Sequence, residues 1–412
     1  MKKTIYSLLL LTLSLCSARA QSITYEDFMK EVAEKNALYL AEKYNVDIAT
    51  ANLEAARVFN DPELSLGYGN NEDWSVQMGQ SVEAELSYNL DLAGVRRARI
   101  AAAGSEKAMT EASVAAYLCG LRMEAEQAWA EAWRLRENCA VLEESVTDMR
   151  QIARSDSLRL SVGDVGLADA MQSRLEARTL AGELVALKAE YSNSLSALSA
   201  LRGGEPIEAL EGDLTAKPLL FTSEQIQLMA EENRSDLKAA ELSNTLSEDN
   251  LRLVKATRGF EMGISVGYSY NTEVRNEIAP APIYNGLSVG VSIPLKFSSA
   301  NKGELNAARA QVSQSRKYYE AARIQVRCEA AQAYNSLLAA NEVVENYDGE
   351  LLSDAKAIAK SRKQGYIQGE SSLLELLSAQ QTYREVMQAY IDACYNRHIC
   401  RAALETAVGK SW

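Results

Sequence analysis

The sequence predicts a mainly α-helical chain of two similar halves, each of which carries two β-strands that span a membrane. Three observations support this fold class: two long stretches without proline, seams of small apolar residues that repeat about every 3.5 positions, and four short segments in which apolar and small polar residues alternate. Each half reads helix, strand, strand, long helix, helix, and the long helices are expected to form coiled coils.

The first 20 residues have the features of an export signal. Two lysines precede an apolar run from Leu8 to Leu15, and Ala18–Ala20 forms a small-x-small cleavage site. The run is too short to cross a bilayer as a helix, which needs about 20 residues, and no later run is long enough. A leucine stands before Cys16 where a lipoprotein has a small residue. We therefore expect residues 1–20 to be removed and Cys16 to carry no lipid.

Composition excludes several classes of function. The chain has 412 residues, with 43 basic and 56 acidic side chains and a formal net charge of −13. An acidic surface repels nucleic acid and anionic lipid headgroups, so both are expected to be poor partners. The one histidine, His398, leaves no basis for most zinc sites, catalytic triads or histidine-based acid–base chemistry. We expect no enzymatic activity, no metal site and no cofactor.

The cysteines and tryptophans give no stronger indication of a site. Five cysteines remain after the signal, an odd number without C-x-x-C spacing, so neither a disulfide scaffold nor a metal knuckle is indicated. Cys394 and Cys400 flank His398, but Cys400 follows it by only two positions and would point elsewhere on a helix. Trp129 and Trp133 lie one turn apart and are expected to pack among the helices rather than to bind a ring.

Long helices are indicated by where proline is missing and by the apolar spacing. No proline occurs in Glu63–Glu205 or Leu295–Trp412, and a proline inside a helix costs about 3 kcal/mol. Steps of three and four, which are typical of coiled coils, connect the seam residues Ala308, Val312, Ser315, Tyr319, Ala322, Val326, Ala330, Ala333, Leu337, Ala340 and Val344. A soluble helical bundle is the alternative, but a helix over Glu304–Asn346 would be about 65 Å long.

Four segments alternate with period two and are predicted to be strands: about 62–70 and 75–90 in the first half, and about 260–272 and 284–296 in the second. An apolar face opposite a small polar face is typical of transmembrane β-barrels, and a half-buried soluble sheet is the alternative. Four strands cannot close, and lipid does not tolerate open edges. Three copies would supply 12 strands, enough for a barrel with an open lumen.

The two halves repeat each other. Leu64–Tyr68 lies 200 positions before Ile264–Tyr268, and Gly163-Asp164 lies 206 positions before Gly369-Glu370. We assign residues 21–205 to the first repeat, 206–221 to a linker and 222–412 to the second repeat. Glycine turns at about 161–167 and 365–372 interrupt helical pattern and are predicted to be hairpin tips.

Several segments together resemble the TolC-like outer membrane efflux protein family over essentially the whole mature chain. The residues that carry the resemblance are Leu90–Arg99, Ile293–Leu295, Gly303–Ala310, Gly365–Gln380 and Ala407–Gly409. The form Asp-Leu-x-Gly-x-Arg-Arg-Ala-Arg is most similar to the branch that works with heavy-metal resistance pumps.

The resemblance implies a homotrimer in the outer membrane of a Gram-negative bacterium, with a 12-stranded barrel in outer membrane lipid and an α-helical barrel in the periplasm. It implies a passive exit duct of a tripartite efflux or type I secretion system, opened by a periplasmic adaptor and an inner membrane pump of the RND type. Metal ions, drugs and peptides all remain open as cargo. A periplasmic coiled-coil adaptor or scaffold is the alternative function.

The resemblance also assigns roles to the hairpin tips, position by position. The tip residues that would meet the adaptor are Val162, Gly163, Gly166, Leu167, Gly369, Ser372 and Leu373. Asp169 and Glu375, early in the returning helices, would lie at the channel entrance, and Ser378 occupies the place of a second acid. Acids at these places also favour a helix N-terminus, so a ring of Glu375 side chains that attracts cations is one of two interpretations.

Overall fold

The computed structural model describes residues 21–70, 74–214, 220–295, 300–347 and 350–410. The predicted signal, with Cys16, lies outside the described residues. The chain divides into two compact units. Residues 43–114 and 235–324 form what we call the sheet unit, and residues up to 42, 115–234 and 325 onward form the hairpin unit.

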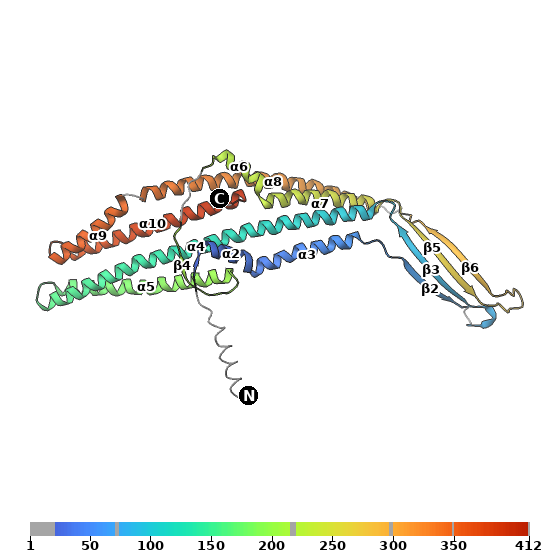
Figure 1. Ribbon diagram of the computed structural model, residues 1–412, viewed down its shortest axis with the longest axis horizontal. Coiled ribbons are helices and arrows are strands. Elements are labelled where there is room, and N and C mark those ends of the chain that lie inside the picture. The colour runs from blue at the N-terminus through green and yellow to red at the C-terminus, as the bar shows by residue number, and fades with distance from the viewer. Residues whose placement is uncertain (1–20, 71–73, 215–219, 296–299, 348–349, 411–412) are drawn as a thin grey trace, which may run out of the picture. The chain divides into compact units, whose positions relative to one another are not determined.

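The sheet unit contains one antiparallel sheet in the order β2-β3-β5-β6. Its strands are β2 (Glu63–Gly69), β3 (Ser81–Leu90), β5 (Met262–Asn271) and β6 (Tyr284–Ser292). Its helical part comes from α3 (Ala37–Arg57), α7 (Ser235–Thr257) and the beginnings of α4 (Val95–Ser161) and α8 (Ala300–Tyr347). Because β3 pairs with β5, the two halves of the sequence meet at the centre of the sheet (Figure 1).

The register gives the sheet one apolar face and one small, polar face. Residues directly opposite one another across a sheet share a face. One apolar row consists of Leu64, Leu86, Val266 and Val289, and the next row, on the opposite face, of Ser65, Glu85, Gly267 and Ser288. The apolar face is uncovered, since Val289 is 82% exposed.

Both edges of the sheet are open. Within the described residues, β2 pairs only with β3, and β6 pairs only with β5. Each edge therefore presents a row of backbone N–H and C=O groups to whatever lies beside it.

The predicted strand over 75–90 is shorter in the structure. A 3₁₀ turn, η1 (Val76–Met78), comes first, and β3 begins only at Ser81. Between them Gly79 has a φ of 74°, a left-handed conformation that ends the extended chain. Alternation alone does not reveal this break, because Val76 and Met78 continue the period of two.

The hairpin unit consists of two helical hairpins and a small parallel sheet (Figure 1). The hairpins are α4 with α5 (Leu167–Leu201), and α9 (Glu350–Gln368) with α10 (Leu373–Val408). Helices α2 (Tyr25–Lys35) and α6 (Ser223–Asn233) complete the unit. Gly365, expected in the second tip, is still helical, so the turn begins later there.

Two strands lie where the sequence analysis expects none. The strand β1 (Gln21–Thr24) pairs in parallel with β4 (Ile207–Glu211), which lies inside the segment assigned as a linker. Both strands are short, and β4 does not alternate strictly, so periodicity gives no signal. Their pairing fixes the start of the first repeat to the segment that joins the two repeats.

The seam in α8 is a packing surface, as its spacing predicts. Val326, Ala330, Leu337, Ala340 and Val344 are all buried. The long helix predicted over Glu304–Asn346 lies within α8, which is described as far as Tyr347, and α9 is described from Glu350. Across the described ranges, no helix is both long and apolar enough to cross a bilayer.

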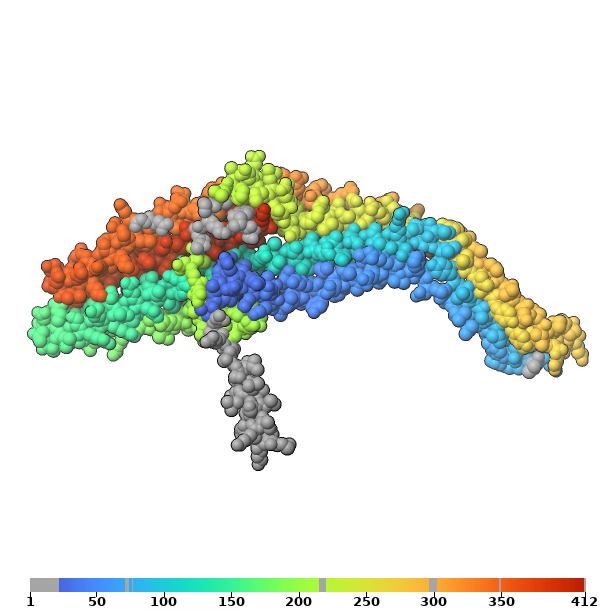
Figure 2. All heavy atoms as spheres, viewed as in Figure 1, coloured from blue at the N-terminus to red at the C-terminus, as the bar shows by residue number. Residues whose placement is uncertain are grey.

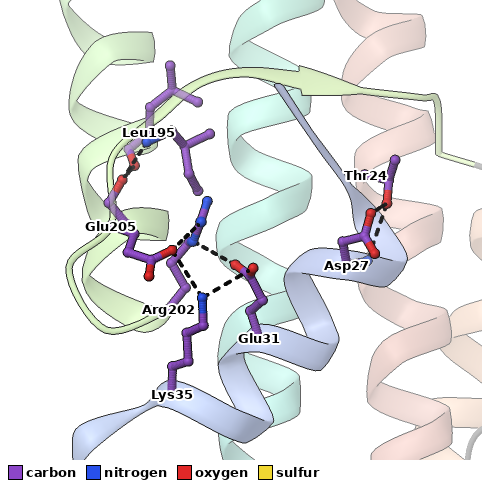
Figure 3. Close-up of polar contacts among 9 residues, drawn as sticks. Thr24, Asp27, Glu31, Lys35, Leu195, Arg202 and Glu205 are labelled. Atoms are coloured by element: carbon purple, nitrogen blue, oxygen red, sulfur yellow. Dashed lines mark hydrogen bonds and ion pairs between the residues drawn. The ribbon is translucent and has the colours of Figure 1, made fainter. Parts of the chain in front are cut away.

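A network of four charged residues connects α2 to the end of α5 (Figure 3). Arg202 lies between Glu31 and Glu205, at 2.8 Å from each carboxylate, and Lys35 lies 3.3 Å and 3.0 Å from the same two groups. The hydrogen bond from Lys35, followed by that from Arg202, lowers the pKa of Glu205 below its ordinary value. The interactions that lower this pKa stabilise the fold at pH values above the ordinary pKa of glutamate. Their stabilisation is lost as the pH falls through the lowered pKa of the folded state.

Replacing Arg202 by methionine should destabilise the packing of α2 on α5 by about 1–3 kcal/mol, because Glu31 loses a charged partner in a site only partly open to water. Hydrogen exchange in the full-length protein should increase at residues 28–36 and 198–206. The control is Lys238→Met, which breaks an exposed pair with Glu241 and should cost under about 0.5 kcal/mol. The Arg202 effect should shrink below about pH 4; equal exchange in the two variants at pH 7 would contradict the role given to Arg202.

Candidate functional site

The two hairpin tips have the same turn. Gly163 and Gly369 have φ values of 81° and 82°. In the first tip, the N–H of Asp164 donates to the carbonyl of Arg159 at 2.9 Å; in the second, the N–H of Glu370 donates to the carbonyl of Gly365 at 2.8 Å. This is the Schellman arrangement that ends a helix with glycine in the left-handed region. Since a Cβ at either glycine would meet nothing within 4 Å, it is backbone conformation, not space, that favours glycine.

The returning helices begin differently. Helix α10 begins with a capping box, in which Ser372 Oγ accepts from the N–H of Glu375 at 3.3 Å and Glu375 Oε2 accepts from the N–H of Ser372 at 3.0 Å. Gly166 caps α5 without a side-chain hydrogen bond, and Asp169 lies in the first turn of that helix. The repeat has therefore kept the turn and changed the cap.

Glu375 already has local partners within the chain. Besides the capping bond, its Oε2 lies 3.8 Å from Arg362 Nη1, and both side chains are about half exposed. Glu375 thus caps helix α10, as the first of the two interpretations expects. Capping leaves the exposed half of the carboxylate available to the surroundings of the tip.

Exposed apolar side chains surround the turns. Val162 is 78% exposed and Leu374 is 77% exposed, and Leu167 is also open to solvent. Leu373, predicted with them as a contact residue, is instead buried at 6% exposure. It belongs to a core cluster behind the tips that contains Val146, Met149, Ile152, Ala153, Ala177, Leu180, Tyr366, Leu373 and Leu376.

The two hairpins of the hairpin unit lie side by side (Figure 2), and a buried hydrogen bond joins them near the tips. Tyr366 of α9 donates its hydroxyl to Asp156 Oδ1 of α4 at 2.9 Å. Arg159, one turn after Asp156, donates to the carbonyl of Tyr366 at 3.4 Å and pairs with Asp164 at 3.2 Å. Burial, together with the Asp156 carboxylate, raises the pKa of Tyr366 well above its ordinary value. The hydroxyl therefore stays protonated and remains a donor at physiological pH.

Asp156 has an unusual environment for a carboxylate. It is completely buried, and among the described residues its Oδ2 has no hydrogen-bond partner. The Tyr366 hydroxyl is thus the main group that compensates its burial. No periodicity in the sequence points to Asp156, Arg159 or Tyr366 as a site. The signals present are that Asp156 interrupts the apolar positions of α4 and that Tyr366 lies in the glycine-containing segment Gly365–Gly369.

The other residues weighed in the sequence analysis lie elsewhere in the hairpin unit. His398 Nε2 lies 2.8 Å from Glu126 Oε2, and Tyr25 donates to the same carboxylate, beside a cavity of about 910 Å³. Trp129 packs against Phe28 with ring centroids 5.3 Å apart. No cluster of three or more histidine, cysteine, aspartate or glutamate side chains in the described part of the chain could hold a metal ion.

Replacing Tyr366 by phenylalanine should loosen the tips, because the buried carboxylate of Asp156 loses the hydroxyl that compensates it, at a cost of about 1–3 kcal/mol. Hydrogen exchange of the intact protein should increase at residues 150–166 and 360–375. The double change Tyr366→Phe with Asp156→Leu should restore protection, since it removes both polar partners. Tyr44→Phe, at an exposed position, is the control. Unaltered exchange in Tyr366→Phe would show that the bond does not hold the tips together.

Comparison with known proteins agrees with this architecture. The family model for "Outer membrane efflux protein" matches residues 228–410. The chain is 24% identical over 394 residues to the cobalt-zinc-cadmium resistance protein CzcC of Cupriavidus metallidurans. This alignment covers 95% of this chain and 91% of that protein.

Solved structures share the fold. CusC superposes with a TM-score of 0.75 at 19% identity, covering 94% of this chain and 92% of that chain. The outer membrane protein VceC from Vibrio cholerae superposes with a TM-score of 0.74 at 18% identity, covering 94% and 96%. The predicted fold class is confirmed. Residues 228–410 thus match the outer membrane efflux protein family, and nearly the whole chain has the fold of the solved structures of CusC and VceC.

Proposed function

We propose that three copies of this chain form one passive exit duct, which receives its cargo from an inner membrane pump of the RND type through a periplasmic adaptor. The observation that carries the proposal is the four-stranded sheet, which has an uncovered apolar face and two open edges. In lipid, open edges are too costly to persist. Pairing β2 of one copy with β6 of the next removes every edge and gives a closed barrel of 12 strands.

The small, polar face of the sheet supports a wide lumen. Glycine and serine lie opposite each other in it, as at Gly267 and Ser288 or Gly290 and Ser265. Side chains this small leave the interior of a 12-stranded barrel open. The charged residues of this face in β2 and β3 are the acids Glu63, Glu83 and Glu85, which favour passage of cations over anions.

The tips support the proposed contact with an adaptor. Val162, Leu167 and Leu374 present apolar side chains around the turns at Gly163, Gly166, Gly369 and Ser372. Exposed apolar groups on a rigid, glycine-ended turn are suited to a protein partner. Buried Leu373 would support this surface from beneath rather than touch the adaptor.

For cargo, we propose divalent metal cations. The relative matched over nearly the whole chain is named a cobalt-zinc-cadmium resistance protein, and the acidic lumen face is compatible with positively charged cargo. Neither the duct nor its tips need bond chemistry for this role, so the chain would act as a channel and not as an enzyme. A periplasmic scaffold is the competing function.

Cell fractionation separates the two functions. The duct should partition with the outer membrane, run as a trimer in mild detergent and conduct ions in planar bilayers. A scaffold would be released by osmotic shock and would be electrically silent. Deleting the gene should sensitise the cell to divalent metals more than to lipophilic toxins if metals are the cargo; the reverse order would point to drugs.

Replacing Val289 by arginine should impair assembly, because this side chain lies on the apolar face and a charge near the bilayer midplane costs about 2–4 kcal/mol. The matched control is Ser288→Arg, the adjacent residue on the opposite face. The yield of heat-resistant trimer in outer membranes should fall for Val289→Arg and stay near the wild-type value for Ser288→Arg. Equal yields would argue that the sheet does not lie in lipid as proposed.

Replacing Glu375 by glutamine tests the entrance role of this residue, because glutamine can still complete the capping box while the charge is lost. If three Glu375 side chains form a ring, the reversal potential in a salt gradient should shift toward lower cation selectivity. Glu375→Asp, which retains the charge, is the control. A reversal potential identical in all three proteins would leave Glu375 with helix capping alone.

A further inference from the structure

Five cationic side chains at the junction between the sheet and its helices lack an acidic partner. They are Arg57 at the end of α3, Arg96, Arg97 and Arg99 in the first turns of α4, and Lys255 in the last turn of α7. Within the described residues, none of the five forms an ion pair with a carboxylate. We call this set the junction cations. All five belong to the sheet unit.

Two of the junction cations are held in place by backbone carbonyl groups. Arg96 Nε donates to the carbonyl of Arg57 at 2.9 Å, and its guanidinium lies 3.9 Å from the centre of the Phe59 ring. Arg99 donates to the carbonyl of Val58 at 3.2 Å. A carbonyl or a ring orients a guanidinium without neutralising it. Asp91 lies close by, but both of its oxygens accept backbone N–H groups of α4, from Val95 and Arg96, at 2.7 Å.

The junction lies at the boundary of the apolar face. Where the helices meet the sheet, Phe59 and Phe260 are exposed at 66% and 53%. At the other end of the strands, Tyr68, Trp74 and Tyr284 are exposed, and such side chains mark the interface between a membrane and water. A strand of ten residues spans about 33 Å and, when tilted, about the thickness of the apolar band of a transmembrane barrel. The junction cations therefore fall at the level of the headgroups.

We propose that the junction cations bind the phosphate groups of anionic phospholipids in the membrane leaflet that faces the helices. This inference rests on the proposed function, because it requires the apolar face to lie in lipid. Arginine suits the task, since its planar donors match phosphate oxygens. The net charge of the chain predicts that anionic headgroups are repelled. The junction cations reverse this repulsion locally, where the strands meet the helices. A trimer would present three sets of junction cations.

The test compares two double variants with the same change in charge. Arg57→Gln with Arg97→Gln removes two junction cations that are exposed and whose side chains form no hydrogen bond or ion pair within the described part of the chain. Arg150→Gln with Arg178→Gln, at exposed positions on α4 and α5 of the hairpin unit, is the control. Delipidated trimers are incubated with mixed micelles that contain phosphatidylglycerol or phosphatidylcholine, and the retained lipid is counted by native mass spectrometry.

Wild-type and control trimers should retain phosphatidylglycerol in preference to phosphatidylcholine, and the junction variant should lose about fivefold in this preference for each arginine removed. Inorganic phosphate at millimolar concentration should not displace the lipid. Equal retention by both variants, or displacement by inorganic phosphate, would overturn the proposal. So would dissociation of the junction variant into monomers, which would assign these side chains to carboxylates of a neighbouring copy.

Failure of the lipid proposal and failure of the duct remain distinguishable. If the wild-type protein forms trimers that conduct ions but binds phosphatidylglycerol no better than the junction variant, only the lipid proposal fails. If the wild-type protein neither forms trimers nor conducts, the duct itself is refuted.

Discussion

A β-sheet with two open edges and an uncovered apolar face cannot persist alone either in water or in lipid. Water disfavours the apolar face, and lipid disfavours the unpaired backbone groups of β2 and β6. Both problems disappear when copies of the sheet join edge to edge and the apolar face turns toward the bilayer. The rest of the molecule is compatible with that solution. The two halves of the sequence each supply one strand pair, and the central pairing of β3 with β5 unites them into a single sheet.

In each helical hairpin, one long helix must end and the next must begin within a short turn. Both tips use a left-handed glycine and the same pair of backbone hydrogen bonds. The segments that follow have diverged: one helix begins with a full capping box, and the other with a bare glycine. Between them lies a buried carboxylate compensated by one tyrosine hydroxyl. A buried polar group that loses its partner costs about 1–3 kcal/mol, so this contact favours the paired arrangement of the tips.

Acidic and basic side chains are distributed unevenly between the sheet and its junction with the helices, and the net charge of the chain does not reveal this. The chain as a whole is acidic, and the polar face of the sheet carries acids as well. Basic groups without acidic partners gather where the strands meet the helices. Electrostatic forces in solution fall off within about 10 Å, so a surface responds to the charges near it and not to the sum over the chain. The net charge of the chain therefore describes the repulsion of distant anions, but it does not describe the charge at the junction between the strands and the helices.

The sequence by itself determined the features that depend on periodicity and on glycine. Alternation from Leu64 to Tyr68 and from Leu287 to Val291 specified two strands and which face is apolar, and spacing along α8 specified its buried seam. These features are local, because they follow from the geometry of one element. Only the tertiary structure decided which elements meet. It paired β1 with β4, buried Leu373 while exposing Leu374, and brought Tyr366 to Asp156 across 210 positions. Such contacts join residues far apart in the chain, and no local period encodes them.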